Sequence, residues 1–531
     1  MTITIKKTVL TFMSILCFST VMAMRSTPDN NGSKENYLTF TAKTNGSAFG
    51  IRNIGNITDI HYSMDGGSTW TKLEEKVLIP LAGKESKVLL KGINPEGFSK
   101  GEKSYTTFIM RGSIAASGSV MSLIDGKGKA TEMPSNYCFN SLFLNCTSLT
   151  QAPELPALKT TEGCYAWMFE GCTGLTQAPR LPAIELSRKC YLRMFSDCAS
   201  LTQAPELPAT SMADSCYTAM FRRCHSLTQA SELPAKALAT DCYSTMFEDC
   251  TILAQAPELP ATTLTIGCYE FMFSGCASLT QAPKLPATTL EEGCYMYMFY
   301  ECTKLEKAPA LPATTLTEGC YGEMFAGCER LTEAPDLPAT QLAGWCYQGM
   351  FSGCTSLKKA PQLPATEMTE LCYKSMFENC TQLMQAPQLP AQTLASDCYR
   401  SMFANCANLT KAPQLPATQL KKKCYAEMFS GCSKLTQAPQ LPAKKLAPTC
   451  YRSMFEGCTS LIQAPQLPAT ELAEECYHYM FANCTHLSQP PVLPKIPAEE
   501  NPFDYILGMF DNCPNVPTNE VKRVEEIRTV E

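Results

Sequence analysis

The feature that most constrains this chain is a 26-residue period in its cysteines. The first series runs through Cys138 and Cys164 and continues at the same interval to Cys476. A second series lies eight residues further along, from Cys146 to Cys484. Fourteen units keep this frame without an insertion. A period held over so many units predicts that each unit packs only on its neighbours, as the coils of a solenoid do.

Each unit is numbered here from position 0 at its first cysteine. Positions 0, 4 and 8 hold cysteine, methionine (or leucine) and cysteine, and aromatic residues fill positions 1 and 5. A stripe at i, i+4 and i+8 predicts a short helix with one buried face. In the second unit, the run from Leu175 to Pro179 predicts a strand, which Pro182 keeps from joining a wide ladder. One short helix and one short strand per coil is the layout of a leucine-rich repeat.

The unit also resembles a known repeat. The run MFSGCASLTQAPKLPATTL, from Met272 to Leu290, resembles the repeats of BspA-type leucine-rich-repeat surface proteins of Bacteroidetes-like bacteria. The matching positions are a phenylalanine, a glycine-cysteine pair, a leucine and a proline: Phe273, Gly275, Cys276, Leu279 and Pro286. The chain departs from that pattern in its longer period, in a cysteine where isoleucine is usual, and in Pro283 inside the strand. The resemblance implies a repeat solenoid that acts as an adhesin at the cell surface.

The rest of the chain divides around the repeats. Lys6 and Lys7 precede an apolar run, which predicts a signal peptide cleaved after Ala23 and a secreted or cell-surface protein. Short β-rich runs separated by Gly and Pro turns predict a small β-sandwich-like domain before the repeats. The expected organisation is a signal peptide (1–23), a flexible leader (24–36), the β-sandwich-like domain (37–118), an N-terminal cap (119–137), the solenoid (138–513) and a C-terminal tail (514–531).

No constellation of residues indicates catalysis. The chain has four scattered histidines and shows no nucleophile elbow, P-loop or dinucleotide fingerprint. The cysteine spacing of C-x7-C differs from the short spacings of zinc sites. A formal net charge of −6 argues against a nucleic-acid partner. We therefore expect no enzyme activity, no cofactor and no metal. Ser63 to Trp70 matches the Asp-box pattern S-x-D-x-G-x-x-W, and this single copy predicts a hairpin rather than a site.

Two opposing considerations bear on whether the cysteines form disulfides or remain reduced thiols. Export favours disulfides, but eight residues of helix span about 12 Å, too far for a bridge within one coil. A bridge from Cys146 to Cys164 of the next coil stays open. In a fifteenth unit, reached after a three-residue slip, Cys513 persists although Tyr505 replaces its partner. This favours two buried columns of reduced thiols.

Positions 1 and 16 of the unit are the two candidate binding surfaces. The tyrosines at position 1 are expected at the edge of the core rather than on a sugar platform. Position 16 is often acidic in the early coils and often glutamine in the later ones. These side chains form either a solvated ladder or a recognition surface. Its candidate binding residues are Glu154, Glu206, Glu232, Glu258, Gln362, Gln388, Gln414, Gln440 and Gln466. The predicted function is an adhesin-like binding protein for host proteins, glycans or other cells; the alternative is a structural spacer on the cell envelope.

Overall fold

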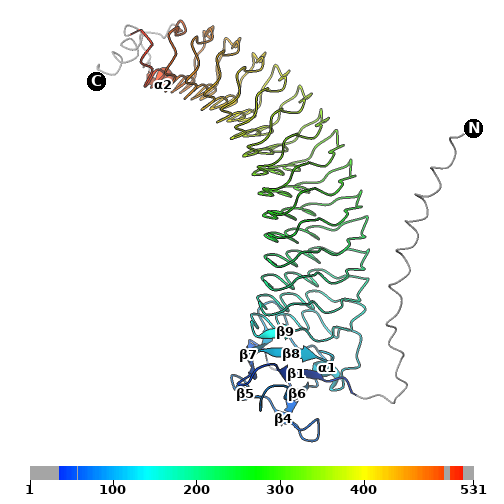
Figure 1. Ribbon diagram of the computed structural model, residues 1–531. Helices are drawn as coiled ribbons and strands as arrows, with labels where there is room; N and C mark the ends of the chain where they lie inside the picture. The colour runs from blue at the N-terminus through cyan, green and yellow to red at the C-terminus, as the bar shows by residue number, and fades with distance from the viewer. Residues whose placement is uncertain (1–34, 57, 495–500, 502, 518–531) are drawn as a thin grey trace, which may run out of the picture.

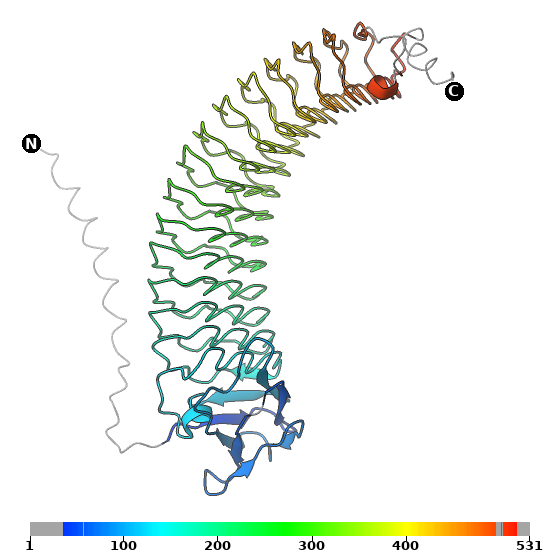
Figure 2. The same cartoon turned by 180° about the vertical axis from the view of Figure 1, so that it is seen from behind.

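The computed structural model describes residues 35–56, 58–494, 501 and 503–517. The expected signal peptide, nearly all of the expected leader and most of the expected tail lie outside the described residues. The described chain forms a β-rich unit followed by a long, curved stack of coils (Figure 1). The same arc is seen from behind in Figure 2. No helix among the described residues is long and apolar enough to cross a membrane.

The N-terminal unit consists of two sheets and one short helix. The six-stranded sheet has the order β4-β3-β6-β1-β8-β9, and the three-stranded sheet has the order β5-β2-β7. The strands are β1 (Leu38–Ala42), β2 (Ala48–Ile54), β3 (His61–Ser63), β4 (Thr71–Lys72), β5 (Ile79–Pro80), β6 (Lys87–Lys91), β7 (Tyr105–Arg111), β8 (Ile114–Ser117) and β9 (Leu149–Gln151). Helix α1 (Ser122–Asp125) follows β8.

Aromatic side chains join the two sheets. Phe40 of β1 makes edge-to-face contacts with Phe49 of β2 and Phe108 of β7, at ring-centroid distances of 5.6 and 5.0 Å. Such pairs add about 0.5–1.5 kcal/mol beyond the burial of their area. The expected hairpin at the Asp box is confirmed: β3 and β4 pair antiparallel, and Asp65 accepts a 2.9 Å hydrogen bond from the amide of Thr69.

The β-rich unit occupies the place of a coil before the first repeat. β8 pairs in parallel with β9, which belongs to the first coil. Phe108 stacks on Phe143 at 5.2 Å, and its carbonyl accepts a hydrogen bond from Sγ of Cys146 at 3.2 Å. These contacts repeat the ones that each later coil makes with its predecessor. Buried side chains from Leu38 to Val516 form one continuous core, so the apolar end of the first coil is covered by β7 and β8.

The predicted helix in each coil is wrong. Between β9 and α2 (Phe503–Ile506), the described residues contain no helix, only consecutive turns. In the second coil the amides of Cys164, Ala166 and Met168 donate to the carbonyl three residues earlier, at 3.1–3.2 Å. The intervening amides of Gly163, Tyr165 and Trp167 donate instead to carbonyls of the next coil, at 2.8–3.0 Å. An α-helix has no free amides of this kind, so the stripe belongs to a different structure.

A left-handed residue at every fourth position produces this structure. In the second coil Gly163, Trp167 and Gly171 have φ angles of 59°, 56° and 71°. The same three places, positions −1, 3 and 7, have positive φ in all fourteen coils. We call the segment from position −1 to position 8 the turn ribbon. Because it repeats every four residues exactly, it places cysteine, methionine and cysteine on one face without the drift of a 3.6-residue helix.

The strand predicted in each coil is reduced to isolated bridges. β9 is the only strand of more than one bridge in the described repeats. Elsewhere single parallel bridges join equivalent residues of adjacent coils, for example Gln203 with Gln229 and Gln437 with Gln463. The prolines on either side of position 16 remove the amides that a longer ladder needs.

The far end of the array keeps the pattern after the slip. Phe510 stacks on Phe481 at 6.0 Å, and Cys513 donates to the carbonyl of Phe481 at 3.0 Å. The amide of Tyr477 in the last full turn ribbon donates a hydrogen bond to the carbonyl of Tyr505 in α2 at 2.9 Å.

Both views place α2, and with it the neighbouring turn ribbon, on the inner edge of the arc (Figures 1 and 2). The turn ribbons therefore line the concave face.

Candidate functional site

The turn ribbon separates side chains that build the core from side chains that vary. Positions 0, 1, 4, 5 and 8 are buried in every full coil. Positions 2, 3, 6 and 7 carry the side chains that reach the concave surface, most of them half-buried. The core positions are almost the same in every coil, whereas positions 2 and 3 range from alanine to arginine, glutamate and tyrosine. The candidate site is consequently this variable concave face.

The tyrosine column belongs to the core, as expected. Tyr321 is 1% exposed and lies 5.8 Å from the rings of Tyr295 and Tyr347. Burial raises the pKa of the Tyr321 phenol well above its usual value. Its hydroxyl finds no hydrogen-bond partner among the described residues. A sugar has no access to these rings.

The two cysteine columns differ in their hydrogen bonds. All 29 cysteines in the described part of the chain are free and buried. Each thiol at position 8 donates to the carbonyl of the phenylalanine in the preceding coil; Cys354, for example, lies 3.1 Å from the carbonyl of Phe325. At position 0 the contacts are longer and fewer: Cys190 lies 4.0 Å from a carbonyl, and Cys216 and Cys372 lie 3.8 and 3.9 Å from methionine sulfurs. Burial raises the pKa of Cys146 and of Cys164 to about 12, which keeps both thiols protonated and unreactive.

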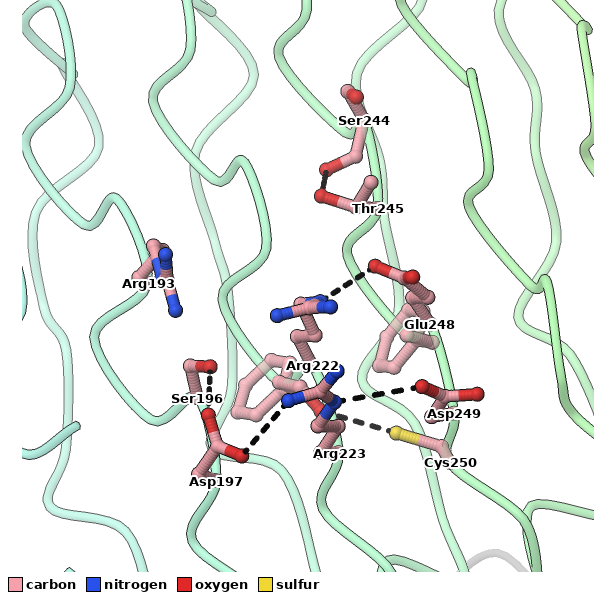
Figure 3. Close-up of polar contacts among 12 residues, drawn as sticks. Arg193, Ser196, Asp197, Arg222, Arg223, Ser244, Thr245, Glu248, Asp249 and Cys250 are labelled. Atoms are coloured by element: carbon pink, nitrogen blue, oxygen red, sulfur yellow. Dashed lines mark hydrogen bonds and ion pairs between the residues drawn. The ribbon is translucent and has the colours of Figure 1, made fainter. Parts of the chain in front are cut away.

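Ion pairs cross the early coils of the concave face (Figure 3). Arg222 reaches Glu248 of the next coil at 2.6 Å. Arg223 lies between two aspartates, 3.9 Å from Asp197 of the previous coil and 3.6 Å from Asp249 of the next. Partly exposed ion pairs each contribute little to the stability of the fold. They do, however, leave the charged side chains of these coils paired with one another.

Aromatic side chains gather in the middle coils of the same face. Phe271 and Tyr297, both at position 3, stack at 4.3 Å with their ring planes 10° apart. Tyr300 meets Tyr297 edge-on at 5.7 Å. Met296 lies against the backbone of Gly322, a position where most other coils carry a side chain. Trp345, at position −1 two coils later, is 44% exposed. We call Phe271, Met296, Tyr297, Tyr300 and Trp345 the aromatic cluster.

Mixed charges return in the late coils. A pocket of about 270 Å³ on the concave face lies between Arg400 and Arg452, where Ala426 replaces a longer side chain at position 2. Glu427 and Glu475 line it and pair with the two arginines. Arg452 also lies over the ring of Tyr479 at 5.7 Å. Lys423 also lines the pocket, so its lining carries three cations and two carboxylates.

The candidate residues at position 16 lie elsewhere. All nine of them are exposed and belong to the proline-rich return segment rather than to the turn ribbon. Glu154 is engaged by the N-terminal unit, since its carboxylate accepts a 2.7 Å hydrogen bond from Asn36. Glu154 and Glu206 each line a shallow pocket among prolines. The structure does not bring this line of residues together with the aromatic cluster.

Positions 2, 3, 6 and 7, which form the concave face, were not among the surfaces predicted from the sequence. Positions 2 and 3 hold twelve and nine residue types in the fourteen coils, but positions 6 and 7 hold only six and five, fewer than the eight at position 10, so variability alone did not mark the concave face. No group of three or more His, Cys, Asp or Glu side chains in the described part of the chain is arranged to hold a metal ion.

Comparison with known families gives one match. The family described as "BspA type Leucine rich repeat region" matches overlapping stretches that together span residues 136–496, which is more than half of the chain. Neither a curated protein nor a solved structure shows a match. The resemblance seen in the repeat motif is thereby confirmed.

Proposed function

Because the chain belongs to the family of BspA-type leucine-rich-repeat proteins, we propose that it is a non-enzymatic binding protein of the secreted or cell-surface class. Repeats of this family commonly mediate protein binding or serve at surfaces, and they are typically non-catalytic. The protein is adhesin-like: it engages host proteins, glycans or other cells through one face of its repeat array.

The observation that carries this proposal is the local concentration of aromatic side chains on the concave face. A spacer needs only solubility at its surface, whereas a binding face needs a localised group of distinctive side chains. The aromatic cluster is such a group, and it lies within a few coils of the concave face. A curved, repetitive face suits large partners because several weak contacts act together.

The residues at position 16 form a second proposed surface. Their change from glutamate in early coils to glutamine in later coils supports a graded contact along the return segment. We likewise propose the division of the chain into a β-sandwich-like domain (37–118), a cap (119–137) and the repeats (138–513).

The alternative function is a structural spacer on the cell envelope. It is favoured by the monotony of positions 12 and 13, where threonine and glutamine recur in most coils. A spacer of this kind has no specific ligand.

An array experiment separates the two functions. The chain from residue 24 is labelled and applied to arrays of extracellular-matrix proteins, glycans and whole cells. We expect saturable binding to at least one class, with a half-maximal concentration that is reproduced in solution. A chain that is folded by circular dichroism but binds nothing on any array is a spacer.

A further inference from the structure

The middle coils of the concave face contain no basic residue. Between Arg223 and Lys374, none of the five turn ribbons (241–250, 267–276, 293–302, 319–328 and 345–354) holds a lysine or an arginine. Their acidic residues are Asp241, Glu248, Asp249, Glu270, Glu301 and Glu323. Glu248 and Asp249 pair with arginines of the preceding coil, and in the described residues no ion pair engages the other four.

These carboxylates surround the aromatic cluster. Glu323 accepts a 3.1 Å hydrogen bond from the hydroxyl of Tyr297. Glu270 precedes Phe271 and Glu301 follows Tyr300 in the chain. Burial and the nearby Asp241 carboxylate raise the pKa of Glu270, as is expected where negative charges meet without a cation. The site therefore offers negative charge, half-buried at Glu270 and Glu323 and exposed at Glu301, beside the faces and edges of aromatic rings.

This combination fits one kind of ligand. A guanidinium or ammonium group is attracted both by carboxylates and by aromatic faces, and arginine stacks on aromatic rings more readily than lysine does. Building on the proposed binding function, we propose that the aromatic cluster with Glu270, Glu301 and Glu323 binds an extended, arginine-bearing segment of a partner protein. Neutral glycans also stack on aromatic rings, but they leave the uncompensated carboxylates without a counter-charge.

The dimensions of the site fit a short segment. Tyr269 and Tyr295, adjacent rings in the buried column, are 5.7 Å apart. The four steps from the coil of Asp241 to the coil of Trp345 therefore extend over roughly 23 Å, the length of about seven residues of extended chain. Arginines at alternate residues of such a segment point to the same side, toward successive coils.

The test is a binding measurement by fluorescence anisotropy on the chain from residue 24. The probe is a labelled peptide of about seven residues that alternates glycine and arginine. Its control replaces each arginine with citrulline, which keeps the shape and removes the charge. The site variant carries E270Q, E301Q and E323Q. The matched control variant carries E306Q, E329Q and E333Q, which remove three exposed charges from nearby coils outside the turn ribbons.

We expect saturable binding of the arginine peptide to the native chain and to the control variant. The site variant is expected to bind roughly tenfold more weakly, since three partly exposed charge pairs are lost, and the citrulline peptide at least as weakly. Tyr300→Leu, which leaves every charge in place, should weaken binding several-fold through loss of the ring. Melting curves of all variants confirm that they remain folded.

Three outcomes overturn the inference: equal weakening by the two triple variants, equal binding of the citrulline peptide, or binding of the neutral sugar maltoheptaose that competes at the cluster. If the arginine peptide does not bind while the arrays detect another ligand, this inference is wrong and the binding function stands. If the arrays detect nothing either, both are wrong.

Discussion

Serine substitutions test whether the two cysteine columns differ in hydrogen bonding, with position 8 donating to a carbonyl and position 0 only filling the core. Cys346 and Cys354 belong to the same coil and are both 0% exposed. Replacing either with serine exchanges a thiol for a smaller and more polar hydroxyl. Only Cys354 has an acceptor in place, the Phe325 carbonyl at 3.1 Å. A serine hydroxyl at position 354 keeps this hydrogen bond. The thiol of Cys346 donates to no acceptor among the described residues, so a serine hydroxyl in its place gains none.

The magnitudes follow from burial. A buried hydroxyl without a partner costs about 1–3 kcal/mol, and a hydrogen bond returns about 0.5–1.5 kcal/mol. We therefore expect Cys346→Ser to destabilise its coil by about 1–3 kcal/mol and Cys354→Ser by less than about 1 kcal/mol. This ordering also explains why Cys513 persists in the last unit, where it donates to Phe481, while Tyr505 replaces its position-0 partner.

The assay is native-state hydrogen exchange of the coil that begins at Cys346, combined with denaturant unfolding of the whole chain. Local exchange is needed because a repeat array opens in parts and its stability is not a single number. Alanine at each position serves as the volume control. Equal losses for the two serine variants, or a greater loss for Cys354→Ser, would refute the assignment of a hydrogen-bonding task to position 8.

Three further predictions concern the core. Phe325 stacks between Phe299 and Phe351 at 5.6 and 5.7 Å. Its replacement by alanine should lower the local stability of its coil by roughly 3–5 kcal/mol, and calorimetry should then show one unfolding transition split into two. An unchanged melting curve would contradict the assigned core. Titration of thiols in denaturant without reductant should give a count near the 29 free cysteines of the described chain, whereas a count near one would mean disulfides. In the native protein at pH 8 the same thiols should resist alkylation, because burial holds the pKa of groups such as Cys432 at about 12, and the protection should disappear on unfolding.

The repeat frame could be predicted because it depends only on the spacing of apolar residues. The burial of Phe325 and Tyr321 and the recurrence of the unit at Cys513 were all deduced from that spacing. The helix was wrong because periods of 4.0 and 3.6 residues are hardly distinguishable over nine residues. Gly171, Gly275 and Asn405 at position 7 carried the missing signal, since glycine and asparagine tolerate a positive φ.

The covering of the first coil was not predictable from the pattern of the repeats. Residues 119–137, the proposed cap, bridge in parallel to the first coil through Ser119 with Glu154 and Glu132 with Lys159. In addition, the carbonyl of Phe108 in β7 takes the part that a phenylalanine of a preceding coil would take. The sequence of β7 does not resemble a repeat. It contacts the first coil mainly through its backbone and the ring of Phe108, and neither requires the repeat motif. The concave face was equally hidden, since its position depends on which residues of the turn ribbon donate to the neighbouring coil.

The aromatic residues of the concave face occupy places that the backbone disfavours. Phe271, Tyr297 and Trp345 have φ angles of 53°, 56° and 57°, and a left-handed conformation costs such residues about 1–2 kcal/mol each relative to glycine. For Phe271 and Tyr297 together this cost is about 2–4 kcal/mol, and their mutual stacking, worth about 0.5–1.5 kcal/mol, offsets part of it. No aromatic ring among the described residues stacks on Trp345, which is also the most exposed member of the cluster. Stacking on a neighbouring ring therefore does not offset the backbone cost at Trp345, which sets it apart from Phe271 and Tyr297.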